Sequence, residues 1–379
     1  MGSQIAGIYS IGLAIAQLMW TIGVFEATTY FATDTGQRFS SEQYLGFKVL
    51  SCVAMVVISI GYVGSFHYDS YKTAIVLSLC AFNLSDAFGL YYFAAFQNAG
   101  RLDISGYSSV MQTLFAVIAF AGTIIISHNL IAAIILATIG KTAWILIYNN
   151  IRLMQVAPIG HINFDRSAMK GLFVELLPLF VSSFLANYLA NIPKYAIDTA
   201  GTSTMQAQFS ILFMPSFVIN LFLIFVMRPL LTPMATMCTQ GNIEGFRKIT
   251  TKIVASIFAA TLVVLVGSYF IGIPILQGIF ALDLQGCLSA LLITMLGGGI
   301  AALSTVFYNN IIILRRQRLV LLVYGASLAV TVLVASPLVA AWGLLGASIC
   351  YAISSACLLI GFALVFWFAM KDRAAEISR

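Results

Sequence analysis

Six ionisable residues lie inside long apolar runs of the sequence, where a charged group needs either a partner or contact with water. They are Glu26, Asp86, Lys141, Glu175, Lys194 and Asp198. A charge at the centre of a lipid bilayer costs on the order of 3 kcal/mol on insertion scales, so such residues favour cavities and ion pairs. We therefore expect some of these positions to mark a binding site or an ion pathway.

The basic residues of this set differ in their neighbours. Lys141 has no acidic residue three or four positions away, so we expect an unpaired cation that faces a water-filled cavity. Lys194 and Asp198 are four residues apart, and they either neutralise each other near the outer surface or face the same cavity. Lys48 and Arg228 lie near the predicted inner boundary, where snorkelling toward water is the simpler interpretation.

These charges predict a binding set with a cationic part and an acidic part. The cations are Lys48, Lys141, Lys194 and Arg228, and the acids are Glu26, Asp86, Glu175 and Asp198. If the cations face one cavity, the ligand is anionic, since lysine holds phosphate as a point charge and arginine can fork to two oxygens. The acids would then be counter-ions, or would bind the proton or sodium ion that drives transport.

The composition requires a membrane around these residues. Of the 379 residues 61% are hydrophobic and 8% are charged, against about 25% charged residues in a globular domain. The mean hydropathy of +0.99 leaves too little polar surface for a soluble enzyme or a disordered chain. The net charge of +6 is typical of cytoplasmic loops in a polytopic protein and is no sign of a nucleic-acid partner.

A crossing of the bilayer takes about 20 helical residues, and the apolar runs predict eleven such helices. They are 5–31, 44–66, 70–97, 105–127, 129–151, 170–198, 207–228, 250–273, 285–314, 317–337 and 340–370. With the N-terminus outside and the C-terminus cytoplasmic, Lys72 alone among the basic residues lies outside, and all others except Lys141 and Lys194 lie inside. This asymmetry follows the positive-inside rule.

The predicted fold is all-α, with about eleven transmembrane helices in two lobes. The expected N-terminal lobe is 1–155 with five helices, 156–169 is a cytoplasmic connection, and 170–379 is a C-terminal lobe of six helices. An external N-terminus with no signal ahead of it is unusual, so we expect one further helix upstream, which would divide twelve helices as six and six.

Motifs for catalysis are missing from the sequence. Gly140-Lys141-Thr142 resembles the end of a phosphate-binding loop, but the glycine required five residues before Gly140 is Ile135. The three histidines fall in separate loops, and the six cysteines form no CxxC pair. We expect no catalytic residue, no metal site and no cofactor, apart from proton or sodium coupling.

Several segments resemble bacterial oligosaccharide flippases over nearly the whole chain. They are Gly7-Ile8-Tyr9-Ser10, Thr29-Tyr30, Tyr44-Leu45-Gly46-Phe47-Lys48, Gly100-Arg101-Leu102-Asp103, Asn191-Ile192-Pro193-Lys194-Tyr195-Ala196-Ile197-Asp198, Arg228-Pro229-Leu230-Leu231-Thr232-Pro233 and Leu296-Gly297-Gly298-Gly299. The resemblance implies the multidrug, oligosaccharidyl-lipid and polysaccharide exporter superfamily, with two six-helix lobes around a cavity that opens alternately to each side. Members often carry a basic residue just before the Thr-Tyr pair, where this chain has Thr28, and the family's first helix is absent.

The resemblance implies a flippase of the bacterial plasma membrane that moves undecaprenyl-diphosphate-linked oligosaccharide to the outer leaflet for surface polysaccharides such as O-antigen or capsule. Its partners would be this lipid-linked glycan, membrane lipids and the polysaccharide polymerase machinery, with no nucleic acid. The alternatives are a proton- or sodium-coupled small-molecule antiporter of the same superfamily and, less well supported, a membrane glycan polymerase. An antiporter of cationic drugs would favour a cavity dominated by acids.

Overall fold

The structure is a computed structural model that describes residues 3–33, 38–66, 68–157, 160–314, 316 and 318–377. Every regular element in these ranges is a helix, and ten helices are long and apolar enough to cross a membrane. The last of these, Leu319–Lys371, contains two helices that meet at Gly343. The all-α fold of a polytopic membrane protein is confirmed; the described residues contain ten candidate spans where the sequence predicts eleven, and the kinked last span accounts for the difference.

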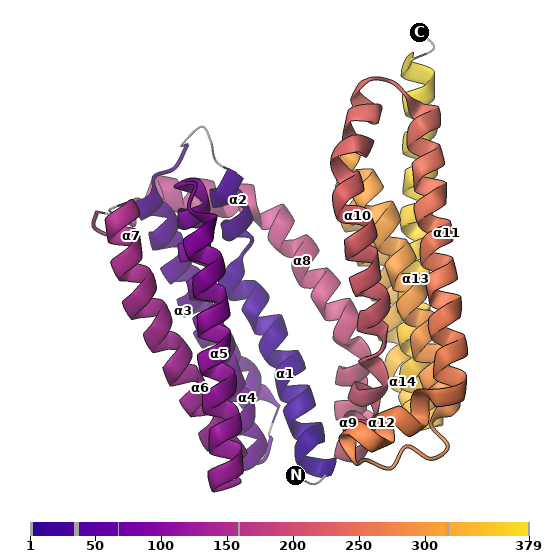
Figure 1. The fold of residues 1–379 in the computed structure, drawn as a ribbon, viewed down its shortest axis with the longest axis horizontal. Helices are drawn as coiled ribbons and strands as arrows, with labels where there is room; N and C mark the ends of the chain where they lie inside the picture. The colour runs from indigo at the N-terminus through magenta and orange to yellow at the C-terminus, as the bar shows by residue number, and fades with distance from the viewer. Residues whose placement is uncertain are drawn as a thin grey trace. The chain divides into compact units, whose positions relative to one another are not determined.

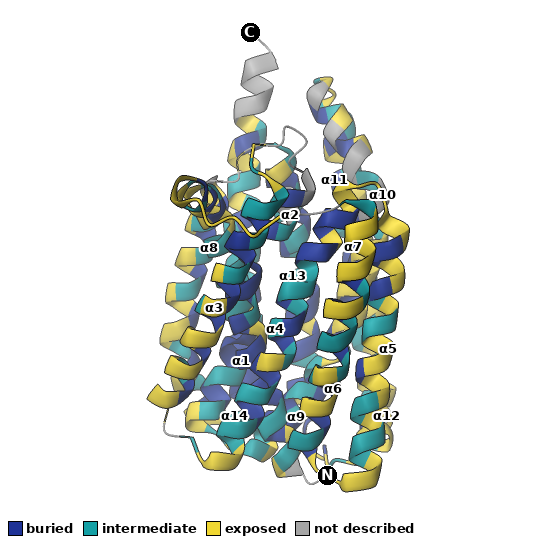
Figure 2. Cartoon of the chain, turned by 90° about the vertical axis from the view of Figure 1, so that its left-hand side faces the viewer, coloured by how far each residue is buried: buried dark blue, intermediate teal, exposed yellow. Residues whose placement is uncertain are grey.

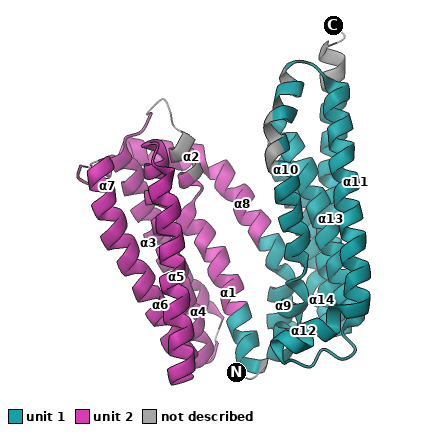
Figure 3. Ribbon diagram, viewed as in Figure 1, with its two compact units in different colours: residues 1–10, 188–379 teal, residues 11–187 magenta. Residues whose placement is uncertain are grey.

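The chain forms two compact units (Figure 3), unit 2 with residues 11–187 and unit 1 with residues 1–10 and 188–379. The sequence predicts a boundary in the connection 156–169, which lies within unit 2 in this division. Hydrogen bonds explain why this connection stays with unit 2. The backbone N–H of Asn163 donates to the Glu42 carbonyl at 3.2 Å, and that of Gly160 donates to the Glu42 carboxylate at 3.1 Å.

Unit 2 is a helical bundle that contains most of the first half of the chain (Figure 1). Its elements are α1 (Ser3–Val24) from residue 11 onward, α2 (Ala27–Thr33), α3 (Ser41–Ser65), α4 (Ser70–Asn98), α5 (Leu102–Ser127), α6 (Leu130–Trp144), the π-helical turn η1 (Ile145–Asn149), α7 (Asn150–Val156) and α8 (Arg166–Ala200) up to residue 187. Figure 2 shows that α1 is buried along most of its length, whereas α5 has many exposed residues. The exposed face of α5 is apolar, as expected for a surface that contacts lipid.

Unit 1 contains the second half of the chain. Its elements, besides the ends of α1 and α8, are α9 (Ser203–Phe213), α10 (Ser216–Thr239), α11 (Ile243–Gly267), the π-helical turn η2 (Ser268–Gly272), α12 (Ile273–Phe280), α13 (Leu288–Ile313) and α14 (Arg318–Ile377). The central helix is α13, which packs against α9, α10, α11 and α14. Three consecutive glycines, Gly297 to Gly299, let these neighbours approach its backbone closely.

Polar side chains cap several helix ends that the apolar runs predict to within a few residues. Ser40 and Gln43 form a reciprocal capping box at the start of α3, with N···O distances of 3.3 and 2.9 Å. Asn129 caps α6 by accepting from the backbone N–H of Ala132 at 3.1 Å. His128 ends α5 in the left-handed conformation, with φ of 51°.

Three helix breaks differ from the predicted spans, and each has a local cause. The predicted helix 5–31 is broken at Phe25 and Glu26, which both adopt positive φ. The predicted helix 207–228 is two helices, because the chain turns at Met214 and Pro215. The break predicted at residues 338–339 lies instead at Gly343, whose φ of 54° and ψ of −125° suit glycine alone.

Candidate functional site

A cavity of about 300 Å³, with mostly apolar walls and several polar side chains, lies inside unit 2 between α1, α4, α5 and η1. It is lined by Gln17, Trp20, Asn83, Asp86, Gly89, Leu90, Phe93, Phe96, Ser105, Ser108, Ser109, Gln112 and Asn149. Amide and hydroxyl groups therefore face aromatic rings across the cavity, and one carboxylate is among them. A concave site that combines apolar walls with a few convergent polar groups is the usual form of a small-ligand pocket.

Two serines of α5 that line the cavity, Ser105 and Ser108, differ in their hydrogen bonding. The Ser108 hydroxyl donates to Asn149 Oδ1 at 2.5 Å and accepts from the Trp144 indole N–H at 3.3 Å, so these groups support one another. The Ser105 hydroxyl is buried and has no hydrogen-bond partner among the described residues. A buried hydroxyl without a partner is costly, and here it is available to a ligand in the cavity.

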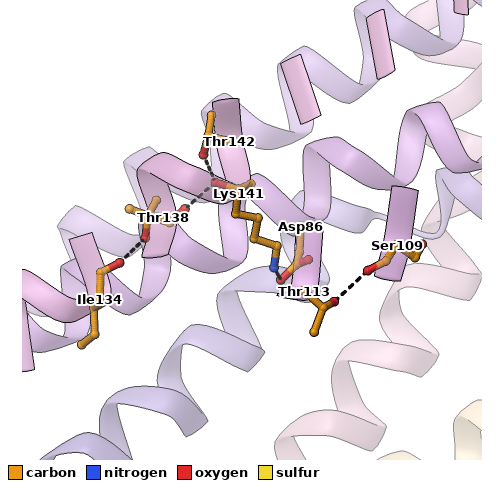
Figure 4. A network of polar contacts seen from close by, with 9 residues as sticks. Asp86, Ser109, Thr113, Ile134, Thr138, Lys141 and Thr142 are labelled. Atoms are coloured by element: carbon orange, nitrogen blue, oxygen red, sulfur yellow. Dashed lines mark hydrogen bonds and ion pairs between the residues drawn. The ribbon is translucent and has the colours of Figure 1, made fainter. Parts of the chain in front are cut away.

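Asp86 is the carboxylate of the cavity, and it forms an ion pair with Lys141 (Figure 4). Lys141 reaches from the last turn of α6 to the middle of α4, and its ammonium also lies 4.1 Å from the centroid of the Phe82 ring. The expectation of an unpaired Lys141 is therefore wrong. Its partner is on another helix, which a search of neighbouring positions within one helix does not find.

The two members of this pair differ in their access to solvent. The Lys141 side chain is 6% exposed and that of Asp86 is 33% exposed. Ser85 and Thr142, the neighbours of the pair, share a hydrogen bond of 2.6 Å that ties α4 to α6 beside it. The cavity therefore carries no net charge in this state, and a small cation or proton that enters it meets the carboxylate before the ammonium.

Lys48 occupies a different part of unit 2 and does not line the cavity. The residue is 1% exposed, and its ammonium donates to the carbonyls of Gly23 and Val24, at 3.0 and 3.1 Å. These carbonyls belong to the end of α1, next to the break that contains Glu26. The snorkelling interpretation of Lys48 is wrong, because the side chain turns into the protein.

Glu175 lies on α8, also away from the cavity. Its carboxylate accepts a bond of 2.8 Å from the exposed Arg38 guanidinium and a further hydrogen bond from the Tyr30 hydroxyl. The sequence predicts a counter-ion for the buried lysines or a coupling group at this position. The observed partner is an arginine of the segment between α2 and α3, separated from Glu175 by 137 positions in the sequence.

The remaining predicted residues belong to unit 1. The Lys194 ammonium lies 5.6 Å from the centroid of the Phe213 ring and is partly buried. Lys194 forms no ion pair with Asp198 or any other carboxylate in the described part of the chain. Arg228 is in α10, and its side chain lies outside the described residues. The prediction that Lys194 and Arg228 share a chamber with Lys48 and Lys141 stays a prediction.

The structure adds neutral polar residues that the sequence reasoning did not select. Ser105, Ser108, Ser109 and Gln112 recur at the spacing of one helical face on α5, and Gln17 on α1 faces the same cavity. Their spacing within an apolar run was a usable signal, although it does not reveal which helix faces them. No group of three or more His, Cys, Asp and Glu in the described ranges could hold a metal ion.

Comparisons with known proteins identify the fold through structure alone. No family model matches the chain, and no curated protein matches its sequence. Among solved structures, an inward-facing multidrug resistance MATE family transporter of the MOP superfamily has a TM-score of 0.72 at 12% identity, covering 98% of this chain and 90% of its own. The MATE transporter VcmN of Vibrio cholerae in its bent form has a TM-score of 0.60 at 14% identity, covering 98% and 87%.

A eukaryotic MATE transporter, AtDTX14, is similar over 98% of this chain and 88% of its own, with a TM-score of 0.61 at 11% identity. These structures share their architecture with nearly the whole chain. Their sequence identities to it are so low that the comparison shows a common fold and nothing about function. The chain therefore has the fold of the MATE transporters of the MOP superfamily.

Proposed function

We propose that this protein is a secondary transporter that works by alternating access and exchanges a small organic solute for a proton or sodium ion. The proposal is the antiporter alternative of the sequence analysis, and the shared fold supports it better than the flippase interpretation. Asp86 is the proposed coupling carboxylate, and the cavity of unit 2 is the place where the coupling ion binds.

The observation that carries this proposal is the ion pair between Lys141 and Asp86, the carboxylate that lines the cavity. Ionisable groups at mid-helix in a membrane are costly, and they are characteristic of ion pathways and proton relays. Asp86 is the partly exposed member of the pair, so an ion in the cavity can reach it. Its protonation would leave Lys141 without a counter-charge. A buried unpaired ammonium is destabilising, so this state would favour a change of conformation.

The test uses the purified protein in liposomes that contain a pH-sensitive dye, with a fluorescent organic cation as the probe solute. An imposed proton or sodium gradient should drive probe movement by the wild-type protein. Asp86→Asn should reduce that movement by an order of magnitude or more. Asp103→Asn is the matched control, because it removes a carboxylate from an exposed ion pair with Arg101, and neither residue lines the cavity.

Two outcomes would oppose the proposal. Gradient-driven movement by Asp86→Asn at the wild-type rate would remove Asp86 from coupling. Probe movement that is insensitive to both gradients in the wild-type protein would remove the antiporter function itself.

A second candidate function is the flippase of lipid-linked oligosaccharides that the sequence resemblance implies. The supporting observation is Lys194, a partly buried cation with no carboxylate partner in the described ranges, next to the Phe213 ring. An ammonium of this kind can attract a diphosphate. Liposomes with a fluorescent polyprenyl-diphosphate disaccharide distinguish the two candidates: a flippase would move it between leaflets and lose that activity in Lys194→Gln, whereas an antiporter would leave it in place.

A further inference from the structure

The break in α1 is an unusual feature of the core of unit 2. Phe25 and Glu26 are consecutive residues with positive φ, 46° and 54°, and neither is glycine. Such backbone conformations cost of order 1–3 kcal/mol each for ordinary residues and persist only where the surroundings enforce them. The break separates α1 from α2 and leaves the last carbonyls of α1 without their usual partners along the helix.

Side chains of α3 satisfy these carbonyls. The Gly23 carbonyl accepts from the Lys48 ammonium at 3.0 Å and from the Ser51 hydroxyl at 2.9 Å. The Val24 carbonyl accepts from the same ammonium at 3.1 Å. Lys48 is fully buried, and among the described residues the Glu26 carboxylate at the break is close enough to act on it electrostatically.

The surroundings of the break are closely packed. The Phe25 ring stacks on Phe180 with a centroid distance of 4.3 Å and meets Phe47 edge-on at 5.4 Å. At Gly23, a β-carbon would meet Met55 Sδ at 2.8 Å and the Ala87 β-carbon at 2.9 Å, so α1 touches α3 and α4 directly there. The oxygen atoms at the break therefore face a small, closely packed space that the Lys48 ammonium fills.

Two carbonyls, a hydroxyl and a nearby carboxylate are the groups that bind monovalent cations at helix breaks in membrane transporters. We propose that the break in α1 is a binding site for a monovalent cation, and that the chain occupies it with its own Lys48 ammonium. Lys48 is thus a positioning residue that fixes the break, and it is not available to a substrate. When the side chain is shortened, the site becomes free for a small amine or a sodium ion.

The test is chemical rescue of Lys48→Ala in the full-length protein in detergent. The substitution should lower the melting temperature, because it removes the ammonium donor from the carbonyls of Gly23 and Val24 and leaves the Gly23 carbonyl with the Ser51 hydroxyl alone. Methylammonium chloride should restore at least half of the lost melting temperature in Lys48→Ala, and sodium chloride should restore a smaller part. Choline chloride, which is too large for the space, should restore none, and the wild-type protein should respond equally to all three salts.

Lys48→Met is the matched variant, because it fills a similar volume without a charge or a donor. It should melt below the wild-type protein, and methylammonium should not rescue it, since the thioether blocks the site. Backbone amides of residues 25–28 should also exchange with deuterium faster in Lys48→Met than in the wild-type protein. A Lys48→Met protein with wild-type melting and exchange would overturn the proposal, as would a Lys48→Ala protein that methylammonium and choline affect equally.

If Lys48→Ala does not accumulate, the exchange measurement on Lys48→Met decides alone, and unchanged exchange at residues 25–28 counts against the site. The result is independent of the proposed transport function, because melting and amide exchange are measured without a substrate.

Discussion

The ion pair of Asp86 and Lys141 can be tested as a pair, because each residue alone would leave the other as an uncompensated charge. We expect Lys141→Met to destabilise the protein by about 2–3 kcal/mol, somewhat less than for a wholly buried pair, since a third of Asp86 is exposed. The double variant Asp86→Asn, Lys141→Met should recover most of that loss. Melting of the single and double variants in detergent gives the coupling free energy.

Additive effects of the two substitutions would show that the pair contributes no coupling. In that case Asp86 would be better described as an independently solvated carboxylate of the cavity. Glu244→Gln is a suitable control with Lys141→Met, because Glu244 lies in the first turn of α11 and belongs to unit 1, whereas the pair belongs to unit 2.

The serines of α5 offer a second test, in which stability and function respond differently. Ser105→Ala removes a buried hydroxyl that has no partner, so stability should stay unchanged or rise by up to about 1 kcal/mol. Ser108→Ala removes a hydroxyl with two partners, Asn149 and Trp144, and should cost about 1 kcal/mol. Chemical unfolding of both variants in mixed micelles checks the contrast.

If the Ser105 hydroxyl serves a ligand, Ser105→Ala should also transport the probe more slowly despite its unchanged stability. Equal losses of stability in the two serine variants would contradict the assignment of Ser105 as unsatisfied.

At the scale of elements, α13 depends on glycines where its neighbours approach most closely. A β-carbon at Gly299 would lie 2.2 Å from Thr261 Cγ2, and Thr261 is buried and β-branched, so it cannot rotate away at low cost. We expect Gly299→Ala to destabilise the protein by about 1–3 kcal/mol through overpacking between α11 and α13. Gly325→Ala is the control, since a β-carbon there meets nothing within 4 Å.

Gly325→Ala should be neutral or stabilising by up to about 1 kcal/mol, because alanine favours the helix more than glycine does. Melting temperatures of the two variants, measured side by side, give the comparison. A Gly299→Ala protein as stable as Gly325→Ala would mean that α11 moves aside freely and that the close packing is not required.

The helices were predictable from the sequence because each depends on a local property, an apolar run of sufficient length. The breaks were less predictable. Phe25 and Glu26 carry no sequence signature of positive φ, and the side chain that satisfies the carbonyls at that break, Lys48, lies on another helix. Pro215 and Gly343 are recognisable breakers, but a sequence with many prolines and glycines does not say which of them ends a helix.

At the scale of the whole molecule, the predicted site residues proved to belong to separate places. Asp86 and Lys141 form one site, Lys48 caps α1, and Glu175 pairs with Arg38. The sequence analysis selected each of these residues for its charge and its depth in an apolar run. Their partners depend on which helices are neighbours, and that information is not contained in the spacing along a single helix.

Orientation in the membrane is the remaining prediction for the whole molecule, and two loops of unit 1 test it. The excess of basic residues predicts that the loop between α10 and α11 is cytoplasmic and that the loop between α12 and α13 is external. Gln240 and Gln285 are exposed residues of these loops. In intact cells, a membrane-impermeant maleimide should label Gln285→Cys and leave Gln240→Cys unlabelled until the membrane is permeabilised.

The native cysteines are a small background in this measurement, because five of the six are buried and Cys357 is partly buried. Both variants should label equally after permeabilisation, which controls for reactivity. Labelling of Gln240→Cys in intact cells would mean that the predicted orientation is the wrong way round, since α11 crosses the membrane between the two loops. The basic excess would then lie outside, and its cause would have to be sought in a ligand or partner and not in membrane insertion.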